Sequence, residues 1–235
     1  MNPQHPRARR KPGDAGPTEK MREYLEVIYY LSARQEPVIA ARLAEWMHVS
    51  APTVTNIVAR LVALELIDRD PRGEIRLTAE GYTLAETMVR RHRILERFLV
   101  DVMGLPWEHI HEEAVRLEHA LSPALEERIA ALVATATTCP HGNPIPGRST
   151  GYPGVLRLSE APVGSTVAVR RIAEEAEEDT EVLRHFQSHA LVPGATVQIL
   201  QASSVGITLQ REQSSITLSP QAAAYLWGDV ITPAP

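Results

Sequence analysis

The chain contains a single cysteine, Cys139, and only two phenylalanines among its 235 residues. One cysteine cannot form a disulfide within the chain, which fits a reducing compartment such as the cytoplasm. No segment approaches the roughly 18 consecutive apolar residues that a membrane-spanning helix needs, and no apolar block follows the basic residues of the N-terminus. We therefore expect a cytoplasmic protein without membrane contact, and the apolar content of 44% is ordinary for a folded chain.

The net charge of −5 is distributed unevenly along the chain. Residues 1–100 carry 16 Lys and Arg against 13 Asp and Glu, whereas residues 101–235 carry 8 against 16. A basic front half can bind phosphate, while an acidic rear half is suited to cations. Residues 1–17 are rich in Pro and Arg and have no apolar periodicity, so we predict a disordered basic arm there.

Residues 18–82 have the pattern of a winged helix-turn-helix domain. Apolar residues at helical spacing predict a helix that begins near Thr18 and a short helix over 39–46. After a three-residue turn, Ser50 and Pro52 open a third helix, which completes a helix-turn-helix pattern. Two short apolar segments around the tight turn at 70–74 then predict the two strands of a wing.

The start of the third helix is predicted to contact DNA, because the N-terminal residues of a recognition helix meet bases and phosphates in the major groove. Small hydroxyl and amide side chains bond to either, a proline packs on a thymine methyl, and arginines of the helix and wing bind phosphate. An ordinary N-cap and a solvated helix face are the alternative for the same residues. The predicted DNA-binding residues are Ser50, Pro52, Thr53, Thr55, Asn56, Arg60, Arg72 and Arg76.

The rest of the chain is predicted to be helical at first and then rich in short strands. A long helix that begins near Gly81 and helices over 107–121 and 123–133 are expected. Residues 139–154 are dense in Gly and Pro and are predicted to be a linker. Strands at 166–172, 196–202, 206–210 and 215–218, with one helix at 180–189, predict a small β-barrel over 155–235.

Carboxylates, imidazoles and the one thiol recur in groups that a metal site could use. A metal ion needs several N, O or S donors that converge on one point, and helices present them at spacings of three or four residues. Each group by itself could be a solvated face. Carboxylates and imidazoles with at most one thiolate suit Mn(II) or Fe(II) better than structural zinc. The candidate ligands are Glu23, Glu26, His92, Glu96, His111, Glu118, His119, Cys139, His141, Glu178 and Glu181.

Five sequence blocks together resemble the diphtheria-toxin-repressor family of metal-dependent transcriptional regulators, which includes the manganese transport regulators. The blocks are 24–29 (YLEVIY), 50–56 (SAPTVTN), 91–97 (RHRILER), 111–119 (HEEAVRLEH) and 142–147 (GNPIPG). The resemblance covers nearly the whole chain after Thr18. It implies a mainly α protein with a winged-helix domain, a helical metal-binding and dimerisation domain at 83–138, and an SH3-like (iron-transport-accessory-like) C-terminal barrel. Members bind palindromic double-stranded DNA operators as metal-loaded homodimers.

The resemblance also implies roles for single residues at the primary metal site. Glu118 and His119 match the ligand pair nearest the DNA-binding domain. Glu23 stands where iron-type members have methionine and manganese-type members have aspartate, and Glu26 matches a manganese-type glutamate. Val115 departs from the family pattern, because this position is cysteine in iron-type members and glutamate in manganese-type members. One ligand of the primary site is therefore missing.

A second metal site follows from the same resemblance. Cys139 and His141 resemble a linker pair that some manganese regulators use there. The matching residues are His92, Glu96 and His111, with Glu178 and Glu181 reaching in from the barrel.

We therefore expect a Mn(II)-dependent repressor of metal-uptake genes, with Fe(II) as the alternative ion, no small-molecule substrate and no enzymatic activity. Three other interpretations compete: a winged-helix regulator that senses a small organic ligand, a metallo-hydrolase that activates water, and a constitutive chromosome-binding protein. The first leaves the clustered donors without a shared role. The second leaves the DNA-binding pattern unexplained, and the third would bind DNA equally well after chelation.

Overall fold

The computed structural model describes residues 16–33, 37–149 and 151–232. Nearly all of the predicted basic arm at 1–17 lies outside the described residues. The chain divides into two compact units, Met1–Glu86 and Thr87–Pro235. In the described part of the chain, no helix is both long enough and apolar enough to cross a membrane.

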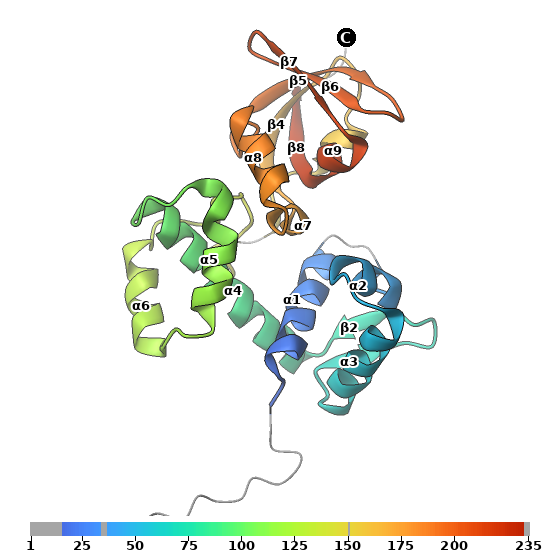
Figure 1. The fold of residues 1–235 in the computed structure, drawn as a ribbon, viewed down its shortest axis with the longest axis vertical. Coiled ribbons are helices and arrows are strands. Elements are labelled where there is room, and N and C mark those ends of the chain that lie inside the picture. Colours follow the sequence, from blue (N-terminus) through green and yellow to red (C-terminus); the bar gives the residue numbers. More distant parts are fainter. Residues whose placement is uncertain (1–15, 34–36, 150, 233–235) are drawn as a thin grey trace, which may run out of the picture. The chain divides into compact units, whose positions relative to one another are not determined.

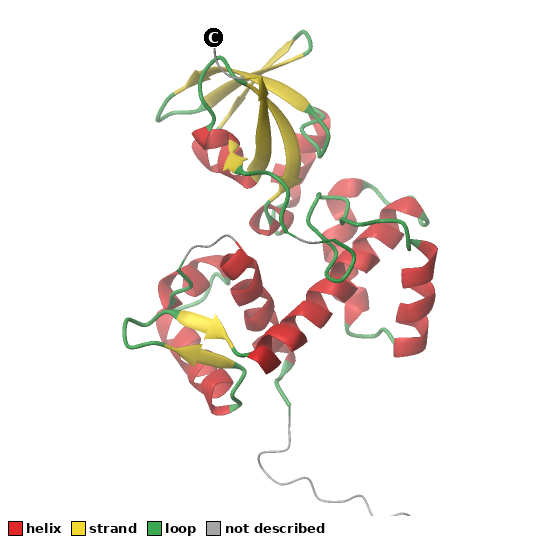
Figure 2. Ribbon diagram, turned by 180° about the vertical axis from the view of Figure 1, so that it is seen from behind, coloured by secondary structure: helices red, strands yellow, loops and turns green. Residues whose placement is uncertain are grey.

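The first unit contains the predicted helices and the predicted wing (Figures 1 and 2). Tyr24, Leu25, Leu43, Leu61 and other apolar residues pack into one buried core. This core fixes the exposed face of the third helix relative to the wing. The elements are α1 (Glu19–Ala33), α2 (Ala40–Trp46), α3 (Ala51–Ala63), β1 (Ile67–Arg69) and β2 (Ile75–Leu77), of which β1 and β2 pair antiparallel.

The turn into α3 differs from the expectation in one detail. Ser50 precedes α3 in an extended conformation, as an N-cap residue does, but its side chain makes no capping hydrogen bond. Its hydroxyl lies 2.9 Å from the hydroxyl of Thr53 instead. Pro52 occupies the first turn of α3, where its missing N–H costs no helical hydrogen bond.

The second unit begins with a helical part. Its first element is the long helix α4 (Ala79–Asp101), whose first residues belong to the first unit. Its core contains Ile94, Leu95, Leu99, Ile110 and Ile129. The helix expected at 107–121 is shorter than predicted and begins as a 3₁₀ turn. The elements are η1 (Trp107–His109), α5 (Ile110–Glu118) and α6 (Pro123–Leu132).

The C-terminal part is an antiparallel six-stranded sheet flanked by short helices (Figure 1), with strand order β3-β8-β4-β5-β6-β7. The strands expected near 166, 196, 206 and 215 are present, whereas β3, β8, α7 and α9 were not predicted. The strands are β3 (Leu156–Arg157), β4 (Thr166–Ile172), β5 (Thr196–Ala202), β6 (Ile207–Arg211), β7 (Ser214–Leu218) and β8 (Leu226–Thr232). The helices are η2 (Leu158–Glu160), α7 (Glu174–Glu177), α8 (Thr180–Ser188) and α9 (Pro220–Tyr225).

The predicted linker begins as a packed loop. Cys139, His141, Asn143 and Ile145 are almost fully buried. Arginines of α4 fasten this loop through its carbonyls, because Arg97 donates to Thr138 O and Cys139 O, Arg93 to Pro144 O, and Arg90 to Pro146 O. Residues 138–146 are therefore held against α4 at three successive points.

A buried ion pair connects α4 to α7. The Arg93 guanidinium, which is 2% exposed, donates to Glu174 Oε1 at 2.6 Å and to the Tyr152 hydroxyl at 2.9 Å. A buried charge is stable only when it is paired and hydrogen-bonded, and Arg93 meets both conditions. The pair therefore fixes the acidic segment that begins at Glu174 next to α4.

We expect Gly142→Ala to destabilise the protein more than Gly194→Ala. Both glycines have positive φ, +88° and +97°, so either alanine costs about 1–2 kcal/mol of backbone strain. A Cβ at Gly142 would also lie 2.2 Å from Arg170 O, whereas a Cβ at Gly194 meets nothing within 4 Å. This clash adds about 1–3 kcal/mol, as overpacking does. Urea unfolding of both variants measures the difference, and equal losses would contradict the close approach at Gly142.

Candidate functional site

Two residues of α4 form the base of a buried polar cluster in the second unit. His92 and Glu96 are four residues apart on one face of the helix, and they are 4% and 0% exposed. Glu96 Oε1 lies 3.3 Å from His92 Nε2. A fully buried carboxylate requires compensating charge or hydrogen bonds, so the surroundings of Glu96 decide what this site can bind.

Three other segments bring donors to Glu96. Its Oε1 lies 3.7 Å from Nδ1 of His111 on α5 and 3.4 Å from Nδ1 of His141 in the loop. Glu177, the last residue of α7, places Oε2 3.5 Å from His111 Nδ1 and Oε1 3.3 Å from His141 Nδ1. Cys139 joins Glu96 and His141 in a second group of donor atoms. The cluster thus combines carboxylate, imidazole and thiol groups from α4, α5, α7 and the loop.

The cluster contains buried polar atoms that no described protein group satisfies. Both carboxylate oxygens of Glu96 and both ring nitrogens of His141 are buried without a hydrogen-bond partner. Buried groups of this kind cost free energy unless a ligand or water completes them. Imidazole and carboxylate donors fit a divalent transition metal, and a buried thiol adds affinity for a softer ion. The residues present therefore fit the metal ion that the sequence predicts.

The imidazoles and carboxylates stabilise each other's charge. Burial lowers the pKa of His92, but attraction to Glu96 and the hydrogen bond with Glu118 outweigh burial and raise this pKa to about 10. Burial also raises the pKa of Glu96, but the charges of His92 and His141 hold it well below its usual range. The carboxylates likewise keep the pKa values of His111 and His141 well above normal despite burial. Protons and a metal ion therefore compete for the same imidazole nitrogens.

The thiol behaves differently from the imidazoles. Burial, aided by the charge of Glu96, raises the pKa of Cys139 to about 12. The protonated thiol is a poor nucleophile, because reactivity resides in the thiolate. A cation that displaces the proton would create the thiolate as its own ligand, so the position of Cys139 suits metal binding better than catalysis.

His92 also connects this cluster to the predicted primary site. Its Nδ1 lies 3.0 Å from Glu118 Oε2, while its Nε2 faces Glu96 and His111. Glu118 is 8% exposed and its Oε1 lies 3.5 Å from Nε2 of His119. Val115, one turn earlier on α5, is 39% exposed. The arrangement resembles the carboxylate–histidine pairs that orient metal-bound imidazoles.

The acidic segment supplies a residue that the sequence interpretation missed. Glu177 is 4% exposed and faces the imidazoles, whereas the predicted Glu178 is more exposed and lies 3.6 Å from His111 Nε2. Glu181 is exposed on α8, where its backbone N–H donates to Asp179. Of these three carboxylates, Glu177 faces both His111 and His141, whereas the assignment of Glu178 and Glu181 as metal ligands stays a prediction. No signal in the sequence indicated Glu177, because the burial of Glu174, three residues earlier, is known only from the structure.

Glu23 and Glu26 both lie on α1 in the first unit. The Glu23 carboxylate accepts a hydrogen bond from Lys20 Nζ at 2.6 Å on the helix surface. Both side chains are partly exposed, so they are accessible to a ligand. Their assignment as metal ligands stays a prediction.

The predicted DNA-reading residues form an exposed face of α3. Pro52, Thr53, Thr55, Asn56 and Arg60 are exposed, whereas Val54, Ile57, Val58 and Leu61 pack into the core. The Thr55 hydroxyl donates to Ala51 O, so its oxygen remains able to accept a further bond. This amphipathic division leaves the start of α3 free to approach a duplex.

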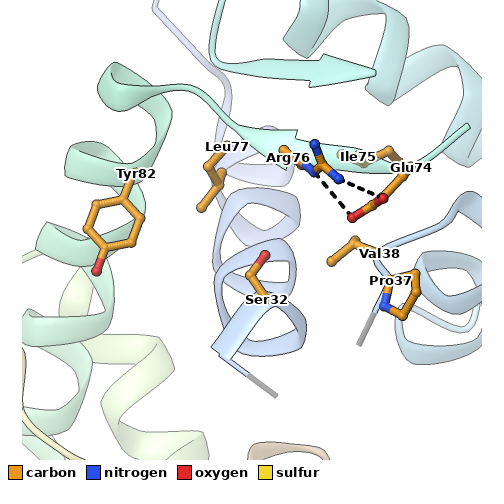
Figure 3. Close-up of a pocket in the computed structure, with 8 residues that line it drawn as sticks. All are labelled: Ser32, Pro37, Val38, Glu74, Ile75, Arg76, Leu77 and Tyr82. Carbon is orange, nitrogen blue, oxygen red and sulfur yellow. Dashed lines mark hydrogen bonds and ion pairs between the residues drawn. The ribbon is translucent and has the colours of Figure 1, made fainter. Parts of the chain in front are cut away.

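The wing carries the two predicted arginines, and a pocket of about 390 Å³ lies beside it (Figure 3). Arg76 of β2 pairs with Glu74 at 2.9 Å, as the dashed lines show, while Arg72 is exposed in the turn. Pro37, Val38, Ile75, Leu77 and Tyr82 supply much of the pocket wall. This largely apolar wall lacks the convergent donors of the buried cluster.

Comparison with known protein families finds three matches that cover most of the chain. Residues 17–75 match the iron dependent repressor N-terminal DNA binding domain. Residues 78–147 match the metal binding and dimerisation domain of the same repressors, and residues 156–229 match the FeoA domain. The order of the matches is that of the winged helix, the helical part and the barrel.

Individual relatives agree with these matches. The chain is 38% identical over 197 residues to the iron-dependent repressor IdeR of Mycobacterium tuberculosis, which covers 79% of this chain and 86% of that protein. It is 32% identical over 192 residues to the diphtheria toxin repressor of Corynebacterium diphtheriae, with 80% of each chain covered. A solved manganese-dependent transcriptional repressor in complex with manganese is 33% identical, with a TM-score of 0.77 and coverage of 90% and 100%. A structure of ScaR with bound Zn²⁺ is 29% identical, with a TM-score of 0.76 and coverage of 90% and 99%.

These matches identify a DNA-binding domain and a metal-binding and dimerisation domain, and the family to which they belong consists of transcriptional repressors and not of enzymes. The chain belongs to the diphtheria-toxin-repressor family of metal-dependent, DNA-binding transcriptional repressors.

Proposed function

We propose that the chain senses Mn(II) and represses metal-uptake genes by binding a palindromic operator as a metal-loaded homodimer. The observation that carries the proposal is the buried cluster around Glu96, in which atoms of Glu96 and His141 have no hydrogen-bond partner among the described residues. A divalent ion would satisfy these atoms and replace the protons on the imidazoles. Because the target is DNA, the protein would act in the cytoplasm.

Manganese is favoured by the donors assigned to the primary site. Glu23, Glu26, Glu118 and His119 offer oxygen and imidazole nitrogen, and Val115 replaces the thiolate of iron-type members. Mn(II) prefers such oxygen-rich surroundings, whereas a thiolate favours softer ions. One similar structure is a manganese-dependent transcriptional repressor in complex with manganese.

Iron is the second candidate, and the sequence relatives favour it. The relative from Mycobacterium tuberculosis, 38% identical over 197 residues, is an iron-dependent repressor. Fe(II) also accepts carboxylate and imidazole ligands, so the buried cluster suits either ion.

Exposed apolar side chains support the proposed homodimer. Leu125 and Leu132 of α6 are 50% and 63% exposed, and Met103 after α4 is 57% exposed. Exposed large apolar side chains in a domain matched as a dimerisation domain are suited to a symmetric interface. A symmetric pair would present two copies of α3 to two operator half-sites, which is why a palindrome is expected.

A DNA-binding titration tests the proposed function directly. We expect Mn(II) to increase operator affinity strongly, Fe(II) to act at higher concentration, and a chelator to return affinity to the apo value. A greater response to Fe(II) than to Mn(II) would make iron the sensed ion. DNA binding that chelation does not change would contradict metal sensing.

Val115→Glu should strengthen the primary site by restoring a carboxylate one turn before Glu118. We expect Mn(II) to activate DNA binding at a concentration lower by about tenfold or more, a scale typical of single groups that tune metal sites. Leu117→Glu is the matched control, since Leu117 has the same 39% exposure but lies on another side of α5. An identical gain in both variants would show a general charge effect and contradict the assigned site.

Asn56→Ala and Arg72→Ala should affect DNA binding in different ways. Loss of a base contact from Asn56 should cost about 1–3 kcal/mol on the operator and little on random DNA. Loss of a phosphate contact from Arg72 should weaken both equally and reduce the salt slope by about 1. Arg184→Ala serves as the control, since Arg184 is an exposed cation of α8. Equal losses on operator and random DNA for Asn56→Ala would remove its role in base reading.

A further inference from the structure

The donors of the buried cluster separate into two sets that share one carboxylate. His92, Glu96, His111 and Glu177 bring four ligand atoms within 4.8 Å of one another. Glu96, Cys139 and His141 form a second set by the same measure. Glu96 is common to both, which is the position of a bridging ligand.

Glu177 spans the same two sets with its separate oxygens. Its Oε2 lies 3.5 Å from His111 Nδ1, whereas its Oε1 lies 3.3 Å from His141 Nδ1. Asn143 Nδ2 donates to the same Oε1 at 3.0 Å and to Ile172 O at 2.9 Å, so the carboxylate is held in place. A carboxylate fixed with one oxygen toward each set is suited to connecting two cations.

The loop holds the second set in position independently of the first. The Trp107 ring packs edge-on against His141 with centroids 4.6 Å apart, and its Nε1–H donates to Pro140 O. Arg97 donates to the carbonyl of Cys139 at 2.8 Å. Neither His141 ring nitrogen has a hydrogen-bond partner among the described residues, although both are buried. A buried imidazole that is held in place but lacks hydrogen-bond partners is suited to binding a cation at this end of the cluster.

We propose that the centre holds two divalent cations at once, bridged by Glu96 and Glu177, with Cys139 and His141 binding the second cation. The inference rests on the proposed function and deepens it, because it assigns two ions where a single sensing ion would suffice. The first cation is held by His92 and His111 on the other side of the bridging carboxylates.

The two positions differ in chemistry. The first offers only oxygen and nitrogen, which suits Mn(II) or Fe(II), while the second adds a sulfur donor, which favours softer ions such as Co(II) or Zn(II). Co(II) is therefore a useful probe, because a cobalt–thiolate bond produces a charge-transfer absorption in the near ultraviolet that oxygen and nitrogen ligands do not.

The test is a Co(II) titration of the full chain without DNA, followed by metal analysis after dialysis. The parent should show the thiolate absorption. Cys139→Ser should lose it and bind one Co(II) fewer per chain. His141→Asn should also bind one fewer, which keeps the test valid if the serine variant does not fold. Glu96→Gln should bind two fewer, because the bridging carboxylate is a ligand of both ions.

His185→Asn is the matched control, since His185 is an exposed histidine of α8 whose ring packs against that of His189 at the end of the helix. This variant should change neither the number of Co(II) ions bound per chain nor the thiolate absorption. Glu118 and His119 are unchanged in every variant, and His119→Ala in the parent background measures any ion bound there so that it can be subtracted. Circular dichroism verifies that each variant is folded.

Three results would overturn the inference. These are no thiolate absorption in the parent, loss of the absorption in Cys139→Ser without loss of an ion, or loss of only one ion in Glu96→Gln. None of them depends on DNA. If the proposed function fails, DNA binding will not respond to metal while the cobalt count still reports the pair, so the two failures are distinguishable.

Discussion

The structure of the second unit depends on a fully buried carboxylate, Glu96. A charge at 0% exposure destabilises the fold unless its surroundings compensate it, and the compensation here comes from three imidazoles. One imidazole belongs to α4 itself, one to α5 and one to the loop after α6. The charge of Glu96 therefore requires three segments distant in sequence to converge, and Glu177 brings in the barrel as a fourth.

Two adjacent faces of α4 bring these segments together around Glu96. His92 and Glu96 form the face that supplies donors, while Arg93 and Arg97, each one residue further along, form the face that binds carbonyls. The second face holds the loop that carries Cys139 and His141, so one helix positions donors on itself and on its neighbour. Arg93 also pairs with Glu174, three residues before Glu177. The same arginine thus fixes both the loop and the start of α7.

The sequence alone predicted the features that depend on the spacing of residues close together in the chain. The helix-turn-helix, the wing and the donor pair on α4 all depend on residues close in the chain, so periodicity and capping patterns predicted them. The family resemblance was needed to connect His111 with His92. Neither could place Glu177, because the run 174–178 contains four glutamates, and only the pairing of Glu174 with Arg93 decides which of them face inward.

Non-local pairing explains the other omissions. Strand β8 reads Leu-Trp-Gly-Asp-Val-Ile-Thr, which has little alternation, and it exists because it pairs with β4 along most of its length. The segment 139–154 was predicted as a linker from its Gly and Pro content. Composition shows that a segment is not helical, but it does not show whether arginines elsewhere bind its carbonyls.

A hydrogen bond of His92 connects the buried cluster with the predicted primary site at Glu118 and His119. A cation bound at Nε2 requires the ring proton to remain on Nδ1, where it is donated to Glu118 Oε2 at 3.0 Å. That bond would orient the Glu118 carboxylate for an ion held by Glu118 and His119. Orientation in advance reduces the entropy lost on binding, and this matters most where Val115 leaves the set one donor short. Because such coupling is reciprocal, an ion held by Glu118 would equally favour the His92 tautomer that the buried cluster needs.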